Sequence, residues 1–413
     1  MTTSGDYANN EKRKIFDDMA SKIPGAKRTK KGVLIPLKGK GNFYHITDMH
    51  KLNTEEHKKY GDEWLEYKVI CDINDYEDII SLKTQSDYLL KLRAESILDN
   101  MRVLRVFQSR FKNSDKMTLS KWYSKYDKPN TYIENISKGA KSKLVNIPAG
   151  TAMLKRSNAI CMSVPPGNII VVSEKLIYAL YFFNIFIYGE SLGFTTQEAI
   201  TGLTIALRTF YGHETLDFDM DTRGEFDKST EMHLQKLLSN QYNFILGHEY
   251  AHHLLGHLND SKLFSERMFL NESKDKVHHY IHKYKEEYDA DWFSIKNITG
   301  NKDYKNEIAN AAFTCFFFFY TLELVGEYLA PQGDASAKSH PPAMDRLFTL
   351  RRKLKANIGH EKEHLEAVKS SIDSVMDYYI KELLPFNMDD FEKYGSYYFE
   401  RFKPLRLSDR IDY

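Results

Sequence analysis

Two different spacings of apolar residues divide the chain into stretches typical of strands and stretches typical of helices. Short apolar runs flank turn residues twice: VLIPL and NFYHI around 38–41, and NAICMSV and NIIVVS around 165–167. Each pair predicts two strands joined by a turn. Apolar residues at helical spacing predict helices over 86–113, 174–190, 196–212, 228–257, 276–297, 305–330, 341–356 and 360–384. The pattern therefore predicts an α+β protein in which a small sheet precedes a mostly helical part.

Changes in composition along the chain suggest four segments. Residues 1–31 are polar and basic, which predicts a flexible arm, and residues 32–150 form a separate N-terminal domain of mixed helices and strands. The stretch 114–150 is rich in Lys, Ser and Asn and is interrupted by Pro129 and Pro148, so we place a domain boundary at its end. Residues 151–358 form the mostly helical domain with the small sheet. Residues 359–413, which begin with a heavily charged helix, form a C-terminal helical extension.

The overall composition excludes several classes of protein. Aromatic residues make up 13% of the 413 residues, which is too many for a disordered chain. The net charge of +1 gives no global attraction to nucleic acid or anionic lipid, so the basic arm is the one nucleic-acid signal, and aromatic residues are sparse in it. Three widely spaced cysteines provide neither a disulfide framework nor a cysteine-rich zinc module. We therefore expect a reducing, cytoplasmic location.

Membrane-spanning segments are not indicated by the sequence. The N-terminus has no apolar core of a signal peptide, and the longest uncharged runs, 176–189 and 308–322, are shorter than the ~20 residues that a spanning helix needs. We interpret both runs as buried core helices. Peripheral membrane association stays open.

The sharpest chemical motif lies in FILGHEYAHHLLGHL, where His248, Glu249 and His252 form an H-E-x-x-H sequence. Positions i and i+4 lie ~40° apart on a helix, so two imidazoles can bind one zinc ion. Glu249 is turned ~100° from His248, where it reaches a water molecule rather than the metal and is suited to general-base catalysis. The apolar flanks of this motif predict a buried helix.

A second H-E-x-x-H match begins at His360 and ends at His364. Its intervening residues, Lys362 and Glu363, are charged, and the helix that follows has a solvated pattern. We therefore interpret the second match as a coincidence.

A catalytic zinc site needs a third protein ligand. The extended motif H-E-x-x-H-x-x-G-x-x-H fails, because Leu255 and Leu258 occupy its last two positions. The sequence YKEEYDADWFS places Glu287 and Asp291 on one helical face, and we assign Glu287 to the metal and Asp291 to holding a ligand histidine. The alternatives are a solvated acidic helix, or ligation by one of the nearby histidines, which are His278, His279 and His282.

Three further residues are candidates for the surroundings of this site. His257 follows His252 by five residues, roughly 140° round an ideal helix, which predicts that it points away from the ion, so we place it behind the ligands. His340 and Arg346, in SHPPAMDRL, are types that stabilise an oxyanion beside a zinc ion. The same stretch also has the pattern of a helix N-terminus, with Ser339 as its cap.

Several motifs now occur in a recognisable order. They are Asn158 and Ala159; Pro165, Gly167 and the run IIVV; His248, Glu249, His252 and His257; Glu287, Ala290 and Asp291; and His340, Pro341 and Arg346. In this order they resemble the gluzincin metallopeptidases of the CaaX-prenyl-protease and HtpX-like group, over about 155–352. A weaker resemblance is to the cytosolic Lit-type phage-exclusion peptidases. The long segment 176–240 and the lack of clear transmembrane helices depart from the first group.

The resemblance implies roles for these residues and an activity. His248, His252 and Glu287 would bind one zinc ion, and Glu249 would be the base. His340 and Arg346 would lie near the substrate carbonyl, and the strand with Asn158 and Ala159 would bind substrate as an added strand.

We therefore expect a zinc-dependent endopeptidase that acts on a protein or peptide substrate. The alternatives are a regulatory or sensor protein with a structural zinc site, or a Lit-like host-defence or toxin peptidase. A solvent-open coordination position separates the first alternative from an enzyme.

Overall fold

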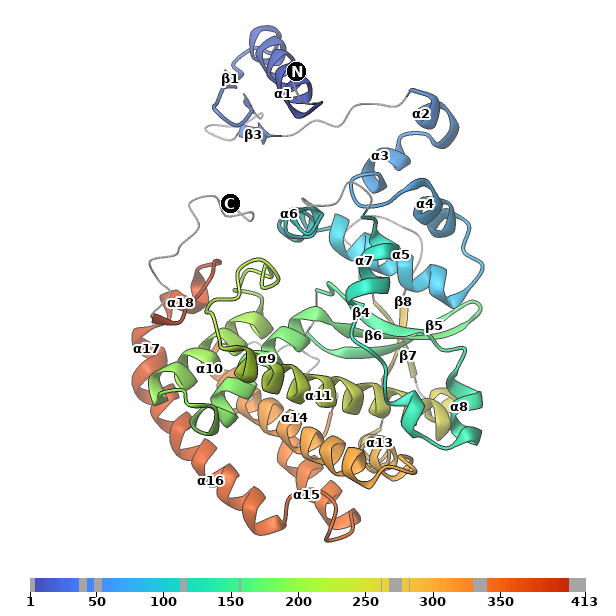
Figure 1. Ribbon diagram of the computed structural model, residues 1–413, viewed down its shortest axis with the longest axis vertical. Coiled ribbons are helices and arrows are strands. Elements are labelled where there is room, and N and C mark those ends of the chain that lie inside the picture. The colour runs from blue at the N-terminus through green and yellow to red at the C-terminus, as the bar shows by residue number, and fades with distance from the viewer. Residues whose placement is uncertain are drawn as a thin grey trace. The chain divides into compact units, whose positions relative to one another are not determined.

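Helices dominate the computed structural model, as the sequence predicts for an α+β, mostly helical protein (Figure 1). The structure describes residues 4–36, 43–47, 54–111, 117–155, 157–260, 262–266, 277–281, 283–329 and 340–400. The chain divides into two units, Met1–Val69 and Ile70–Tyr413.

The first unit combines short helices with a three-stranded antiparallel sheet. Its elements are α1 (Ser4–Lys22), β1 (Lys27–Arg28), β2 (Val33–Pro36), β3 (Phe43–Ile46), α2 (Thr54–Tyr60) and α3 (Glu63–Tyr67). The pairing of β2 with β3 confirms the predicted strand pair. The segment 1–31, expected to be a flexible arm, contains α1 and β1. Phe16 of α1 is buried beneath the guanidinium of Arg28, which also pairs with Asp17 at 2.7 Å.

The second unit begins with helices, continues with a sheet and ends with a helical layer. Its first helices are α4 (Ile73–Ile80), α5 (Gln85–Leu98), α6 (Met101–Ser109), α7 (Leu119–Tyr126) and α8 (Lys138–Leu144). The strands are β4 (Ala149–Ala152), β5 (Ala159–Val164), β6 (Gly167–Ser173), β7 (Lys262–Glu266) and β8 (Val277–Ile281). The helical layer contains α9 (Glu174–Tyr188), α10 (Thr196–Tyr211), α11 (Lys228–Leu254), α12 (His257–Asp260), α13 (Tyr284–Lys296), α14 (Lys302–Leu329), α15 (Ala343–Lys353) and α16 (Lys362–Tyr378). A π-helical turn (Tyr379–Leu383), α17 (Leu384–Phe386) and α18 (Asp389–Glu392) follow.

The five strands of the second unit form one sheet in the order β4-β6-β5-β8-β7. Only β4 and β6 run parallel; the other pairs are antiparallel. Alternate residues of β5 and β6 point to opposite faces of the sheet. Ile160 and Met162 pack with Leu89 and Leu92 of α5 on one face, while α11 lies against the other (Figure 1).

Two predicted helices differ from the structure. The helix expected over 86–113 is broken, because the side chain of Asn100 caps α6 by accepting hydrogen bonds from the amides of Arg102 and Val103. The helix expected over 276–297 begins at Tyr284, and its first residues lie in β8, which pairs with β5.

The predicted domain boundary near residue 150 also differs from the division that the structure shows. Strand β4, which lies in the Pro-interrupted stretch, pairs with β6, and α5 packs on the same sheet. Residues 70–150 therefore belong to the unit that contains the strands and the helical layer.

Helix α14 is a long, apolar helix. By length and composition alone, Lys302–Gly326 is long and apolar enough to cross a membrane, and 72% of its most apolar window is buried inside the protein. The buried side chains of Phe313, Phe316 and Phe318 pack among the surrounding helices. The run 308–322 is thus a core helix of the unit, as expected from its pattern.

Candidate metal centre

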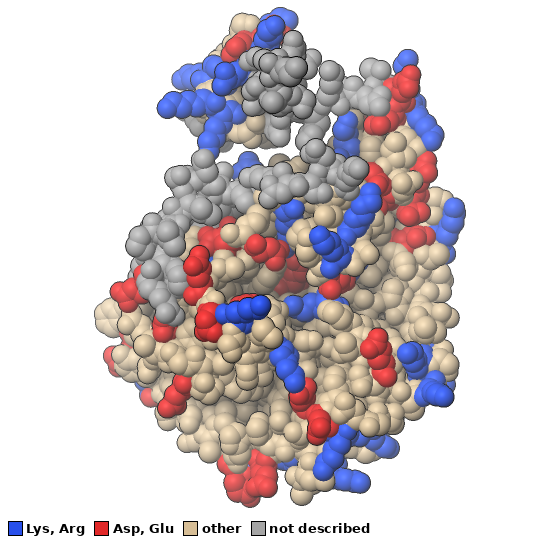
Figure 2. Space-filling model, in the orientation of Figure 1, with Lys and Arg blue, Asp and Glu red and all other residues tan. Residues whose placement is uncertain are grey.

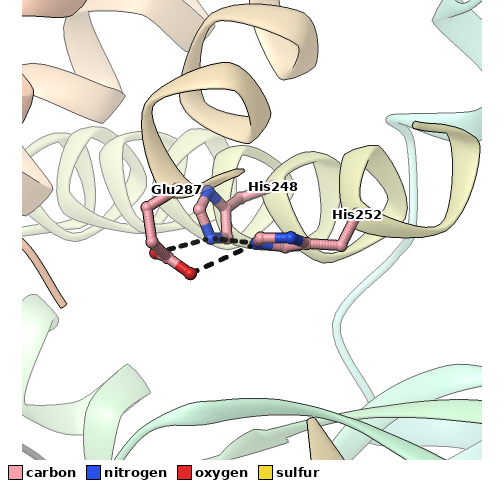
Figure 3. A group of neighbouring side chains, drawn as sticks. All are labelled: His248, His252 and Glu287. Atoms are coloured by element: carbon pink, nitrogen blue, oxygen red, sulfur yellow. Dashed lines mark hydrogen bonds and ion pairs between the residues drawn. The ribbon is translucent and has the colours of Figure 1, made fainter. Parts of the chain in front are cut away.

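Two helices bring three ligand side chains together between them. Helix α11 carries His248 and His252 one turn apart, and α13 crosses it and presents Glu287 (Figure 3). All three residues are buried, and their ligand atoms lie within 4.8 Å of one another. Among the described residues, this is the one group of His, Cys, Asp and Glu with such a geometry.

The distances within this group suit a tetrahedral metal ion. The two Nε2 atoms of His248 and His252 lie 3.1 Å apart. The Oε2 atom of Glu287 lies 3.5 Å from Nε2 of His248, and its Oε1 atom lies 3.5 Å from Nε2 of His252. A tetrahedral zinc site with metal–ligand distances of ~2.0–2.2 Å separates its donor atoms by about 3.4 Å. Two imidazoles and one carboxylate are also a typical ligand set of catalytic zinc.

His248 is oriented by a buried ion-pair chain. Its Nδ1 atom lies 2.9 Å from Oδ1 of Asp291, and Arg346 binds both oxygens of Asp291, at 2.7 and 2.9 Å. Burial opposes protonation of His248, but Asp291 and Glu287 outweigh it and raise the pKa to about 10. The Nε2 side of this imidazole therefore faces negative charge that attracts a cation.

Arg346 lies behind the ligands. Its side chain is buried, its guanidinium stands 5.0 Å from the ring centroid of Phe316, and its Nη2 atom also approaches Glu287 at 3.6 Å. The guanidinium of Arg346 forms a bidentate ion pair with the carboxylate of Asp291, and that carboxylate contacts the ligand His248. The pairing places Arg346 behind Asp291, and its role near the substrate carbonyl stays a prediction.

His252 is contacted by His257 on the side opposite the ligand atom. The Nδ1 atoms of the two residues lie 3.0 Å apart. This agrees with the expectation that His257 lies behind the ligands, although α11 ends at Leu254 and Gly256 adopts a φ of 75°, so His257 is not part of that helix. That turn brings His257 back against the helix, where it holds the ring of His252.

Glu287 is held by His340, whose Nδ1 atom lies 2.8 Å from Oε2 of the carboxylate. Burial opposes ionisation of Glu287, but His340 and His248 outweigh it and hold its pKa well below the usual range. The side chain of His340 is 49% exposed, whereas that of Glu287 is 1% exposed. The solvent-accessible side of the centre is therefore the side of His340.

Glu249 lies on the face of α11 that is turned toward the sheet. Its carboxylate raises the pKa of the buried thiol of Cys161 in β5, after the larger effect of burial. Burial also raises the pKa of Glu249 itself, against the opposing charges of His248, His340 and Arg346. A carboxylate with a raised pKa holds a proton more readily than an ordinary carboxylate, which suits a general base.

One contact that joins α11 to α13 is not indicated by any motif in the sequence. Tyr132 lies against Gly247, where an added Cβ would come within 2.6 Å of its ring, and its hydroxyl donates to the carbonyl of Ser294 at 2.8 Å. The side chain of Asn243 accepts from the amide of Tyr132 at 2.8 Å. A glycine within an otherwise apolar helix, directly before the motif, is the one signal that could have indicated a close contact there.

The remaining predicted residues lie at other places. Asn158 and Ala159 lie at the start of β5, whose side chains reach the α11 face of the sheet. β5 is an interior strand of the sheet and not the expected edge, since β8 pairs with it at Met162 and Ser163. His360 and His364 lie at the N-terminal end of α16, with ring centroids 4.4 Å apart, and no described carboxylate or thiol completes a metal group with them. His278 and His279 lie in β8, with side chains outside the described residues, as are His282 and Ser339.

Comparison with known proteins identifies one related family. The family model described as Peptidase U49, the Lit-type peptidase family, matches residues 218–368, which is less than half of the chain. The span contains α11, α13 and α15, and therefore all three candidate ligands, Glu249 and the residues that hold them. No curated protein and no solved structure matches the chain. The match supports a peptidase function, whereas the resemblance to the CaaX-prenyl-protease and HtpX-like group is not confirmed.

Proposed function

We propose that the protein is a zinc-dependent endopeptidase with Glu249 as its general base. The observation that carries the proposal is the convergence of His248, His252 and Glu287 at the separations of a tetrahedral site, inside the span that matches a peptidase family. These three residues would hold the ion, and a bound zinc ion would supply Lewis-acid activation of water and of the scissile carbonyl.

The chain's own residues would then perform the proton transfers. Glu249 takes a proton from the attacking water and passes it to the leaving amine, a role for which its raised pKa is suited. His340, half exposed beside Glu287, lies where it can donate to a developing oxyanion. Asp291 and Arg346 keep the imidazole of His248 in the tautomer that leaves Nε2 free for the metal.

An extended substrate would bind along the free part of β5. Strand β8 occupies this edge at Met162 and Ser163, and no described strand pairs with Ala159–Cys161 on the same edge. An extended substrate segment would add to the sheet there as a further strand. This assignment is supported by the effect of Glu249 on Cys161, whose thiol pKa is raised by burial and then by this carboxylate.

A structural zinc site is disfavoured by the position of His257. His257 is the obvious candidate for a fourth ligand, but it contacts Nδ1 of His252, the nitrogen turned away from the group. Three described residues would then bind the ion, which supports a fourth position for water or substrate.

The family match favours a Lit-type peptidase over a prenyl-protein or heat-shock protease. A host-defence or toxin role follows from that alternative. Inducible expression in bacteria, with and without phage challenge, tests it: the wild type should restrict growth or plaque formation and Glu249→Gln should not. Equal effects of both proteins would exclude a proteolytic defence role.

Cleavage itself is tested with a peptide library from a bacterial proteome and mass spectrometry of the new termini. The zinc-loaded wild type should generate them, and Glu249→Gln should reduce cleavage ~10²–10⁴-fold while keeping its zinc. An identical set of termini with both proteins would show that Glu249 is not the base. Loss of zinc in Glu249→Gln would place this residue on the metal instead.

A further inference from the structure

In the first unit, α1 packs on one face of the small sheet, and the described residues leave Lys27, Phe43 and His45 exposed on the other. Residues directly opposite in antiparallel strands share a face. The pairs Arg28↔Val33 and Val33↔Ile46 therefore lie on one side, where Val33 is fully buried and Arg28 covers the ring of Phe16 in α1. Helix α1 thus packs on this side against β1 and β2, while Tyr44 of β3 is 63% exposed.

The other side presents basic and aromatic groups. The register places Lys27, Leu34 and His45 in one row across this face, with Pro36 and Phe43 in the next row. Lys27 and His45 are exposed, Phe43 is 42% exposed, and the ammonium of Lys27 stands 6.0 Å from the centroid of that ring. The basic residues of 27–31 and the ring-bearing residues of 43–45 lie apart in the sequence. The strand pairing brings Lys27 onto the same face as Phe43 and His45.

The net charge of residues 1–47 is positive, whereas that of the remaining residues is negative. Residues 1–47 contain ten Lys and Arg but four Asp and Glu, while the other residues contain 48 and 53. Two of the acidic side chains are neutralised locally, since Asp17 pairs with Arg28 and Asp18 with Lys22. In the view of Figure 2, Lys and Arg side chains cover more of the first unit's surface than Asp and Glu side chains do.

We propose that the open sheet face of Lys27, His45 and Phe43 binds single-stranded nucleic acid. An exposed ring stacks on an unpaired base, and adjacent cations bind the phosphates. Four-residue strands rise ~13 Å in length, so the face has room for two or three bases.

Single strands suit this surface better than two other anionic partners. The rings of duplex bases are stacked on each other and offer no free face to Phe43. An anionic membrane would require a broad apolar area, and the aliphatic residues of this face, Leu34 and Pro36, are half-buried. Both partners are included in the test.

The test measures binding of the full chain to a labelled oligo(dT) and oligo(U) by fluorescence anisotropy over a range of salt concentrations. We expect salt-dependent binding that weakens roughly tenfold or more in Phe43→Ala, because one stacked base is lost. Lys27→Glu and Lys30→Glu should weaken binding and reduce the salt slope by about one each. Lys30 lies in the turn between β1 and β2, so its substitution leaves the sheet core unchanged.

Matched controls exclude a general loss of charge or of aromatic surface. Phe386→Ala removes a ring that is 84% exposed in the second unit, and Lys141→Glu reverses an exposed charge on α8; neither should change binding. All variants should keep the wild-type circular dichroism and peptide cleavage. Absence of binding at low salt, equal binding by Phe43→Ala, duplex binding as tight as single-strand binding, or binding of phosphatidylserine vesicles in place of the oligonucleotide would each overturn the proposal.

Discussion

Each ligand side chain at the candidate metal centre is held from behind by a second polar residue. Asp291 holds His248, His257 holds His252, and His340 holds Glu287. Such partners fix ring orientation and carboxylate position, so less ordering is needed when the metal binds. The consequences of removing a ligand and of removing its holder should therefore differ in size.

Glu287 and Asp291 allow this difference to be measured on one helix. Glu287→Ala leaves two imidazoles and should abolish stoichiometric zinc binding. Asp291→Asn keeps the volume and one acceptor oxygen for Arg346, and should weaken zinc affinity ~10–100-fold. Competition with a chromophoric chelator gives both affinities. If Asp291→Asn removed zinc as completely as Glu287→Ala, Asp291 would be a ligand and the assignment on α13 would be reversed.

The two H-E-x-x-H sequences are distinguished by a second pair of variants. His252→Ala should remove most of the zinc, because its Nε2 atom faces both other ligands. His364→Ala should leave the zinc content unchanged, since His364 is exposed on α16 and the described residues give it no third ligand. Elemental analysis of both purified variants is the measurement, and loss of zinc in His364→Ala would move the site to α16.

At the scale of elements, α11 is positioned by a contact that needs a glycine. The ring of Tyr132 lies against Gly247, and its hydroxyl reaches α13 at Ser294. Tyr132 thereby links the helix with two ligands to the helix with the third. A change at this contact should shift the two helices relative to each other.

Gly247→Ala should destabilise the protein by ~1–3 kcal/mol, because the new methyl group would lie 2.6 Å from the ring of Tyr132. Chemical denaturation measures the effect. The matched control is Gly139→Ala in α8, where nothing lies within 4 Å of the added carbon, and helix propensity should give a gain of ~0.5–1 kcal/mol. Equal effects of the two substitutions would show that the contact with Tyr132 is unimportant.

Local patterns predicted most of the helical layer, the two strand pairs and the motif that carries His248, Glu249 and His252. They were wrong where contacts with a distant part of the chain determine the local structure. Residues 277–281 were expected in a helix but form β8, which pairs with β7 and, at His278 and His279, with β5. Tyr132 contacts Gly247 across more than a hundred residues, and no local pattern contains that contact.

At the scale of the whole molecule, a bound metal would connect parts of the second unit that are distant in the chain. Helices α11 and α13 are separated by α12, β7 and β8, and their ligands converge on one point. An ion that binds only the folded arrangement stabilises it by mass action, so the unfolding equilibrium should depend on zinc.

Zinc at a thousand times its dissociation constant should therefore stabilise the protein by about 4 kcal/mol and raise the melting temperature. Chelation should reverse the shift, and Glu287→Ala should show none of it. Differential scanning calorimetry with stepwise zinc addition measures the effect. An equal zinc-dependent shift in Glu287→Ala would show that the ion binds elsewhere.

The part of β5 that β8 leaves unpaired is short: Ala159–Cys161. Under the proposed function, a substrate segment can bind along this edge only after it has unfolded locally and become extended over several residues. For a folded target, the cleavage rate would then follow the free energy of opening that segment, rather than the residues beside the scissile bond. Selectivity would lie in the local stability of the target, and a factor that loosens one loop of another protein would be enough to make that loop a cleavage site.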